Sequence, residues 1–258
     1  MHGGAISLAN QFLERSGEYD LILATDMMDL ALFKSLISEK YNDTPIALYF
    51  HENQLCYPWS ETDRDVQKNR DSHYGFINFS SALVADKVFF NSYFHKNAFL
   101  GALPNFLKGF PDYNELDSIK KIKEKSEVLH LGMDLQKFDK YKCKANSKPL
   151  ILWNHRWEYD KNPKDFFKAL YLLQEKNLDF EVVVLGENFR KIPEEFEIAK
   201  EKLKDKILFM GYADSFKDYA TWLWKAHILP VTSNQDFFGG SVVEAIYCNC
   251  HPILPNRL

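Results

Sequence analysis

The segment His227–Ala245, HILPVTSNQDFFGGSVVEA, joins an apolar run to a glycine turn and the start of a helix. The run 227–231 predicts a buried strand, and the residues from Ser241 predict a helix. Gly239 and Gly240 leave the backbone between them without Cβ atoms, so amides can face a ligand there. A helix N terminus favours an anionic group such as a diphosphate. We therefore predict an anion-binding strand–turn–helix unit at this point of an α/β fold.

Two acidic residues, Asp236 and Glu244, flank this glycine turn. Ser241 and Glu244 match a capping box, in which the glutamate satisfies the first helical amide. Alternatively, both carboxylates bind a ligand, together with the aromatic pair that precedes the glycines. The segment alone leaves both explanations open.

The C-terminal half contains further alternating strands and helices. Asn162 followed by Pro163 predicts a helix that begins there. Arg156 and Lys161 precede that helix on one loop, where a diphosphate binds best, although two ordinary surface cations are the alternative. Tyr212 is placed to flank a base, and ordinary packing explains it equally well. The predicted strands are Leu150–Trp153, Phe180–Gly186, Lys206–Gly211 and His251–Pro255, and the other helices are Glu194–Lys204 and Ser215–Ala226.

The N-terminal half shows the same alternation. Gly101–Lys125 contains two prolines and is predicted to be irregular, and the Lys-rich stretch Lys140–Lys148 predicts a linker. Strands that alternate with helices favour doubly wound parallel sheets, whose ligands lie beyond the carboxyl ends of the strands. The predicted strands are Asp20–Ala24, Ile46–Phe50, Val88–Asn91 and a short one from Val128, and the helices are Met28–Lys40 and Tyr74–Ala85.

Polar residues crowd the predicted carboxyl end of the strand that ends at Phe50. Four of them follow it directly, namely His51, Glu52, Asn53 and Gln54. Such a group at a strand end favours a functional site over a set of ordinary loop residues. A second polar group, Arg70, Asp71 and His73, precedes the helix from Tyr74, and a capped helix start explains it equally well.

Composition excludes several classes of protein. The chain has 258 residues, 46% hydrophobic and 15% aromatic, which is ample for packed cores. A net charge of −4 provides no global basic field for nucleic acid, so an RNA partner would need local patches. No apolar run reaches the ~18 residues of a membrane span, and no signal-peptide pattern opens the chain, so we expect a cytoplasmic protein without a membrane partner. Cys248 and Cys250 lack zinc spacing, and we expect buried thiols there.

Several longer strings resemble one family of enzymes. They are YFHENQLCYP (49–58), RDSHYGFIN (70–78), ADKVFFNS (85–92), VLHLGMDLQKF (128–138), LWNHRWEYDKNP (152–163), VLGENF (184–189) and the QDFFGGSVVEA string. In this order they are similar to retaining glycosyltransferases of group GT4, and most closely to the tRNA-queuosine α-mannosyltransferases and their bacterial relatives.

The resemblance implies a GT-B fold, in which two Rossmann-like doubly wound domains face a cleft. It places an acceptor-side domain at 1–127, a hinge at 128–148 and a donor-binding domain at 149–258. Chains of this family begin with an additional strand and glycine-rich loop and continue beyond Pro255. We therefore expect this sequence to lack both ends and its first sheet to have an open edge.

The resemblance also implies roles for individual residues. His51 faces the transferred sugar, and Asp236 contacts the donor sugar, where the group more often has Glu. Arg156 and Lys161 hold the diphosphate, and Glu244 contacts the ribose. The expected catalytic residues are His51, Asp236, Arg156 and Lys161. The remaining donor-side residues are Gly186, Tyr212, Phe238, Gly239 and Gly240. The acceptor-side candidates are Glu52, Asn53, Arg70, Asp71 and His73.

The substrates that the resemblance implies are GDP-mannose as donor and the cyclopentene diol of queuosine in tRNA as acceptor. No metal or other cofactor is expected, because two cationic side chains and a helix dipole stabilise the negative charge of the diphosphate. One alternative is a related transferase with another donor sugar or a small-molecule or lipid acceptor. Another is a non-catalytic fragment that binds a nucleotide sugar. A Rossmann-type oxidoreductase is disfavoured because no G-x-G-x-x-G follows a strand.

Overall fold

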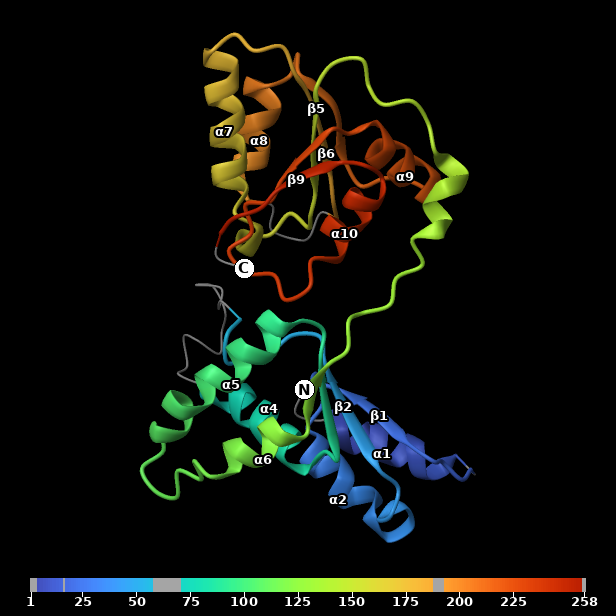
Figure 1. The fold of residues 1–258 in the computed structure, drawn as a ribbon, viewed down its shortest axis with the longest axis vertical. Helices are drawn as coiled ribbons and strands as arrows, with labels where there is room; N and C mark the ends of the chain where they lie inside the picture. The colour runs from blue at the N-terminus through green and yellow to red at the C-terminus, as the bar shows by residue number, and fades with distance from the viewer. Residues whose placement is uncertain (1–3, 16, 58–70, 188–192, 257–258) are drawn as a thin grey trace. The chain divides into compact units, whose positions relative to one another are not determined.

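The computed structural model describes residues 4–15, 17–57, 71–187 and 193–256. The chain forms two compact units, Met1–Leu131 and Gly132–Leu258 (Figure 1). The division between the units falls inside the segment 128–148 that the sequence suggests as a hinge.

The N-terminal unit contains a parallel sheet in the order β1-β2-β3-β4. Its register pairs Ile22 with Ile46 and Ala47 with Lys87. Because every crossover runs in the same direction, right-handed connections bring the described helices to one face of the sheet. The elements are α1 (Gly4–Glu14), β1 (Ile22–Thr25), α2 (Leu30–Tyr41), β2 (Ile46–Phe50), α4 (Asp71–Val84), β3 (Lys87–Phe90), α5 (Tyr93–Lys108), α6 (Ser118–Glu124) and β4 (Ser126–Val128).

A single hydrophobic core fills the space between this sheet and its helices. Alternate strand residues such as Leu48 and Val88 enter that core from the sheet, as the period of two requires. On β1 the alternation leaves Leu23 65% exposed on the opposite face. Among the described strands β1 pairs only with β2, so it forms one edge of the sheet.

Two sequence-based predictions in this unit are wrong. The segment from Gly101 is not irregular, because α5 continues through Pro104 to Lys108. Phe99, Leu103 and Leu107 recur every four residues and are all buried, so packing of this face outweighs the backbone hydrogen bond that proline removes. The last strand ends at Val128 instead of beginning there, because the residues that pair with β3 are Ser126, Glu127 and Val128.

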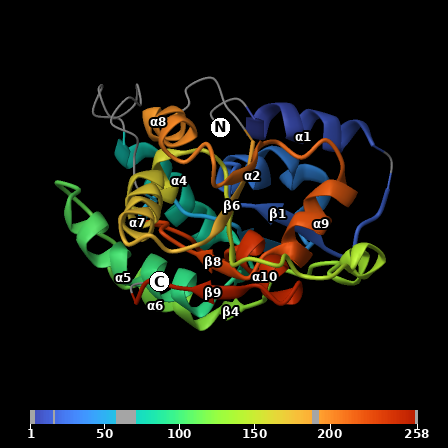
Figure 2. The ribbon, with the colours of Figure 1, turned by 90° about the horizontal axis from the view of Figure 1, so that it is seen from above.

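The C-terminal unit is a doubly wound α/β layer with strand order β7-β6-β5-β8-β9. Helices α7 and α8 lie on one face of the sheet, and α9 and α10 lie on the other (Figures 1 and 2). The elements are η1 (Gln136–Tyr141), β5 (Leu150–Asn154), η2 (Tyr159–Lys161), α7 (Pro163–Glu175), β6 (Glu181–Leu185), α8 (Glu194–Lys202), β7 (Ile207–Gly211), α9 (Phe216–Lys225), β8 (Ile228–Pro230), α10 (Gly240–Tyr247) and β9 (His251–Ile253).

The strand order of this unit reverses between β5 and β8. From β5 the chain adds β6 and β7 on one side, then returns to add β8 and β9 on the other. In open parallel sheets, ligands bind outside the carboxyl ends of the strands at such a switch point. The loops that follow β5 and β8 are therefore where a site is expected.

The position directly after β6 requires a glycine, Gly186, because the backbone of another segment passes close to it. A Cβ there would lie 2.2 Å from the His155 carbonyl oxygen, and the φ angle is +148°. Gly211, at the end of β7, has a nearly equal φ of +152°, but a Cβ would meet only Phe209, at 3.9 Å.

We predict that Gly186→Ala destabilises the C-terminal unit by about 2–4 kcal/mol, because backbone strain is combined with a clash. Gly211→Ala is the matched control, since it adds the strain alone. Urea unfolding followed by tryptophan fluorescence measures both variants. Equal losses in the two variants would show that the contact with His155 has no role.

Candidate functional site

Two loops meet at the switch point of the C-terminal sheet. The loop after β5 runs from His155 to Asn162, and the loop after β8 leads to α10. The amide of Asn234 donates to the Asp160 carbonyl at 2.7 Å, and the Thr232 hydroxyl donates to the Lys161 carbonyl at 2.9 Å. These bonds fix the two loops against each other.

The Lys161 ammonium joins the same loops through charge. Its Nζ lies 3.0 Å from Asp160 Oδ2, 3.0 Å from Asp236 Oδ1 and 3.2 Å from the Gln235 carbonyl oxygen. An ammonium has three donors, and these three acceptors use all of them. The Lys161 side chain is only 10% exposed and that of Asp160 is fully buried. Lys161 thus holds two carboxylates in place.

Only one of the two carboxylate oxygens of Asp236 is hydrogen-bonded among the described residues. Its Oδ1 accepts from Lys161, whereas Oδ2 is buried and has no hydrogen-bond partner among the described residues. Buried polar atoms are normally satisfied, so an orphaned carboxylate oxygen indicates an acceptor for a ligand's hydroxyl. The predicted acidic residue therefore lies at the switch point with a fixed orientation.

The glycine turn opens directly onto α10. Gly239 has a left-handed backbone with φ of +74° and is the N-cap, so the helix begins at Gly240. The first amides of a helix have no partner within it and face an incoming anion. Phe238 precedes the turn and is half-buried, whereas Phe237 is buried in the unit. Phe238, Gly239 and Gly240, which the sequence suggests as donor-binding residues, thus lead directly into this helix N terminus.

The capping-box explanation of Ser241 and Glu244 is wrong. Because two glycines let the helix begin one residue earlier, Ser241 is its second residue, and its hydroxyl lies 3.1 Å from Nδ1 of His155. Glu244 accepts a 2.7 Å hydrogen bond from the Tyr219 hydroxyl instead of capping the helix. Burial and the neighbouring Glu244 raise the pKa of Tyr219.

A pocket of about 290 Å³ lies beside these residues, along the carboxyl ends of β5, β6 and β7. Gly186 and Tyr212 contribute to its wall, and Tyr212 is 67% exposed. Tyr219 links the pocket to Glu244 through their hydrogen bond. The structure therefore places Tyr212, predicted to flank a base, on the pocket wall, and it places Glu244, predicted for the ribose, one hydrogen bond from that wall.

Arg156 and Lys161 share a loop but differ in environment. The Arg156 side chain is 49% exposed, and its guanidinium lies 3.3 Å from Glu158. Lys161 is enclosed by the two aspartates. Arg156 is thus the more accessible of the two cations that the sequence suggests for a diphosphate.

In the N-terminal unit, His51 follows β2 and is held by Asp26. Asp26 accepts from the His51 amide at 2.8 Å, and the same carboxylate oxygen lies 3.4 Å from Nδ1 of the ring. Burial raises the pKa of the Asp26 carboxyl, and the bond from the His51 amide opposes that rise. The imidazole remains half exposed, with its Nδ1 edge toward Asp26.

Asp26 and Asn91 are site residues that the sequence analysis missed. The Asn91 amide nitrogen donates to the His51 carbonyl at 2.8 Å, and its oxygen lies 2.9 Å from Nδ1 of His95. Each residue follows the end of a strand, β1 or β3, and that position was the signal that could have identified them.

The described acceptor-side candidates, Glu52, Asn53 and His73, have different surroundings. Glu52 accepts from Gln54 at 3.1 Å, and Asn53 is fully buried, where its oxygen accepts from the amides of Leu55 and Cys56. Asn53 therefore shapes the turn after His51. Arg70 lies outside the described residues; Asp71 begins α4, but the description does not extend to its side chain. His73 lines a different pocket along α4.

Metal-ligand geometry is missing from the part of the chain that is described, where no three His, Cys, Asp or Glu side chains are placed to hold an ion. Cys248 and Cys250 are buried thiols, as expected, and burial raises the pKa of each to about 12. Within the same residues, no helix has the length and apolar character to cross a membrane.

Comparisons with known proteins agree on one family. Residues 1–133 match the family described as tRNA-queuosine alpha-mannosyltransferase N-terminal, and residues 136–257 match glycosyl transferases group 1. The tRNA-queuosine alpha-mannosyltransferase of Drosophila melanogaster is 35% identical over 257 residues, which cover 96% of this chain and 66% of that protein.

Solved structures of low sequence identity share the fold. HepE of Anabaena in complex with UDP gives a TM-score of 0.61 at 17% identity, covering 96% of this chain and 62% of that one. The alpha,alpha-trehalose-phosphate synthase of Burkholderia xenovorans gives a TM-score of 0.63 at 15% identity, and the match covers 95% of this chain and 59% of the synthase. The GT-B assignment and the parallel α/β architecture are confirmed.

Lys161→Met tests the central ion cluster. Removing the ammonium leaves Asp160 and Asp236 uncompensated in a mostly buried site, so we expect a loss of about 3–5 kcal/mol in the free energy of unfolding. Lys168→Met, on the exposed face of α7, is the control and is expected to change stability by less than about 0.5 kcal/mol. Urea denaturation gives both values, and a loss below about 1 kcal/mol for Lys161→Met would contradict the cluster's structural role.

His155 predicts a pH dependence of stability. Burial lowers the pKa of His155 to about 4, so the folded state keeps it neutral while the unfolded chain takes up a proton near pH 6.5. The C-terminal unit should therefore lose stability as pH falls from about 6.5 towards 4. Four of the five tryptophans lie in this unit and report its unfolding. His155→Gln should flatten the dependence between pH 7 and 5, and an unchanged slope would refute the assignment.

Proposed function

The chain belongs to the tRNA-queuosine alpha-mannosyltransferase family, and on that premise we propose that it is a retaining glycosyltransferase that moves mannose from GDP-mannose to queuosine in tRNA. The proposed acceptor group is the cyclopentene diol of queuosine. The chain spans 66% of the length of the curated relative that it matches.

The observation that carries the proposal is the arrangement of Asp236. One of its oxygens is held by Lys161, the other is unpaired among the described residues, and the N terminus of α10 follows four residues later. A carboxylate acceptor beside free helical amides suits a ligand that joins sugar hydroxyls to a diphosphate. Nucleotide sugars have this combination.

The proposed donor is bound by three parts of the C-terminal unit. The base lies in the pocket by Gly186 and Tyr212, and Glu244 accepts from the ribose while Tyr219 holds it. The diphosphate contacts the first amides of α10 and Arg156. Lys161 contributes less free charge than the sequence suggests, because two carboxylates neutralise it.

The proposed reaction proceeds on one face of the sugar. The leaving diphosphate accepts the proton of the acceptor hydroxyl as the new glycosidic bond forms and the sugar–phosphate bond breaks. Arg156 and the α10 dipole stabilise the negative charge that develops on the diphosphate. His51 steadies the transferred sugar, with its ring held by Asp26.

Incubation of the protein with radiolabelled GDP-mannose and queuosine-containing tRNA, followed by nucleoside analysis, tests the proposal. We expect label in mannosyl-queuosine and none with tRNA that lacks queuosine. Transfer from another nucleotide sugar would show that the proposed donor is wrong. Transfer to a small molecule or lipid would show that the proposed acceptor is wrong. GDP binding without transfer or hydrolysis would indicate a binding protein.

Asp236→Asn is predicted to separate catalysis from nucleotide binding. Loss of a charged hydrogen bond to the sugar should lower kcat/KM for transfer by about 10- to 100-fold. The affinity for GDP should remain within about twofold, since GDP carries no sugar beyond its ribose. Asp205→Asn, at an exposed turn, is the control. If Asp236→Asn weakened GDP binding and transfer equally, Asp236 would not act on the sugar.

A further inference from the structure

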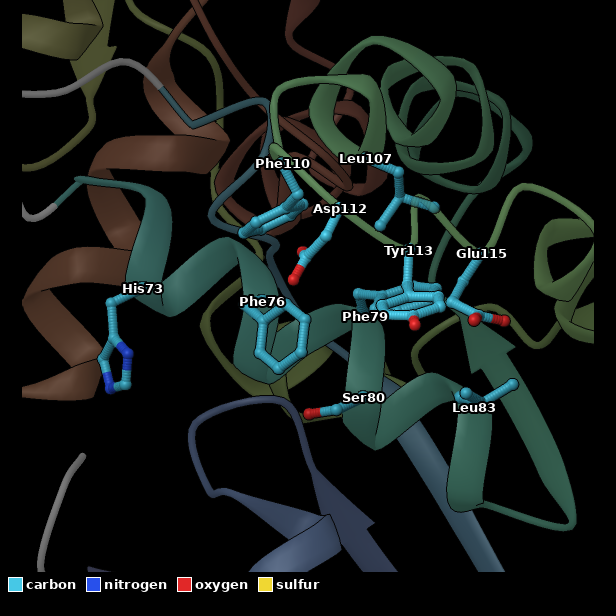
Figure 3. Close-up of a pocket in the computed structure, with 10 residues that line it drawn as sticks. All are labelled: His73, Phe76, Phe79, Ser80, Leu83, Leu107, Phe110, Asp112, Tyr113 and Glu115. Carbon is cyan, nitrogen blue, oxygen red and sulfur yellow. The ribbon is translucent and has the colours of Figure 1, made fainter.

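A second pocket lies in the N-terminal unit. Its volume is about 620 Å³, within the range of small-molecule sites. It lies along α4, next to the end of α5 and the segment that leads to α6 (Figure 3). Among the described site candidates, only His73 lines it, and its ring stands apart from the other lining rings (Figure 3).

Aromatic rings form much of the lining. Phe79 is buried, Phe76 is 45% exposed, and Tyr113 is 86% exposed. Phe76 meets Phe110 edge-on, with ring centroids 5.6 Å apart, and lies 5.9 Å from Phe79. Four aromatic rings around one hollow present several electron-rich faces to a ligand.

The charged groups of the lining are acidic. Asp112 and Glu115 line the pocket, and the Asp112 carboxylate is drawn between the rings of Phe110 and Phe76 (Figure 3). Among the described residues that line the pocket there is no lysine or arginine. The lining therefore complements a positive charge.

The segment that carries three of these residues is anchored to α5. The side-chain amide of Asn114 donates to the Leu107 carbonyl at 3.0 Å and to the Phe110 carbonyl at 2.9 Å. These bonds fix the course of the segment beyond α5, and the ring of Phe110 contacts Phe76 of α4. Such preorganisation lowers the entropic cost of binding.

We propose that this pocket binds a small organic cation, an alkyl-substituted ammonium attached to an apolar group. The ammonium would lie against the faces of Phe76 and Phe110, with Asp112 and Glu115 supplying the opposite charge. The apolar group would lie over Phe79 and the pocket's leucines. The exposed ring of Tyr113 would cover the ligand.

Two ligands of equal shape test the proposal on the full chain. One is 4-hydroxyphenethyl-trimethylammonium, and the other is its uncharged analogue 4-(3,3-dimethylbutyl)phenol. Because cation–π and ionic contacts act on the cation alone, calorimetry should show it binding about tenfold more tightly than the neutral analogue. Equal or tighter binding of the neutral analogue would overturn the proposal, as would failure of the cation to bind at a concentration of about 10 mM.

Variants locate the binding. The double variant Asp112→Asn with Glu115→Gln should weaken binding of the cation by about tenfold and leave binding of the neutral analogue unchanged. Tyr113→Ala should weaken the cation, whereas Tyr93→Ala, at a tyrosine that is 69% exposed and outside the pocket, should not. All of these side chains are exposed, so the thermal midpoint should stay constant. Equal effects of the two tyrosine variants would place the binding elsewhere and overturn the proposal.

Discussion

The ammonium of Lys161, enclosed by Asp160 and Asp236, is the interaction on which the C-terminal unit depends. It bridges the loops after β5 and β8, which diverge where the strand order reverses. Each aspartate would be costly to bury alone, and the shared cation makes both tolerable. The same pairing fixes one oxygen of Asp236 and leaves the other for a ligand. Lys161 thus stabilises the unit and orients the aspartate that we propose as a ligand-binding residue.

Both units place polar side chains at the carboxyl ends of parallel strands. In the C-terminal unit these side chains surround the beginning of α10, where backbone amides add a positive field. In the N-terminal unit a buried carboxylate, Asp26, orients His51, while Asn91 ties the residues after β2 and β3 together. Parallel sheets with short turns repeatedly bring such residues to one edge, which explains why adjacent strand ends supply a site.

Sequence patterns predicted most strands and the polar residues that follow them, because apolar runs and turn residues are local signals. The start of α7 was also predicted, since Asn162 caps it and Pro163 begins it. Features set by tertiary contact were not predictable. Helix α5 continues through Pro104 because Phe99 and Leu103 are buried. Helix α10 starts earlier than predicted because Gly239 is its N-cap. Lys161 meets its two aspartates only once the loops after β5 and β8 have folded together. Asp26 and Asn91 were missed because a single polar residue at a strand end is a weak signal.

Amide hydrogen exchange with and without GDP is the measurement that bears most directly on the switch-point site. We expect the strongest protection in two segments, the loop 155–161 and the beginning of α10 at Gly239–Val243, since both border the proposed position of the diphosphate. Protection found only in the N-terminal unit, or no protection at saturating GDP, would contradict it.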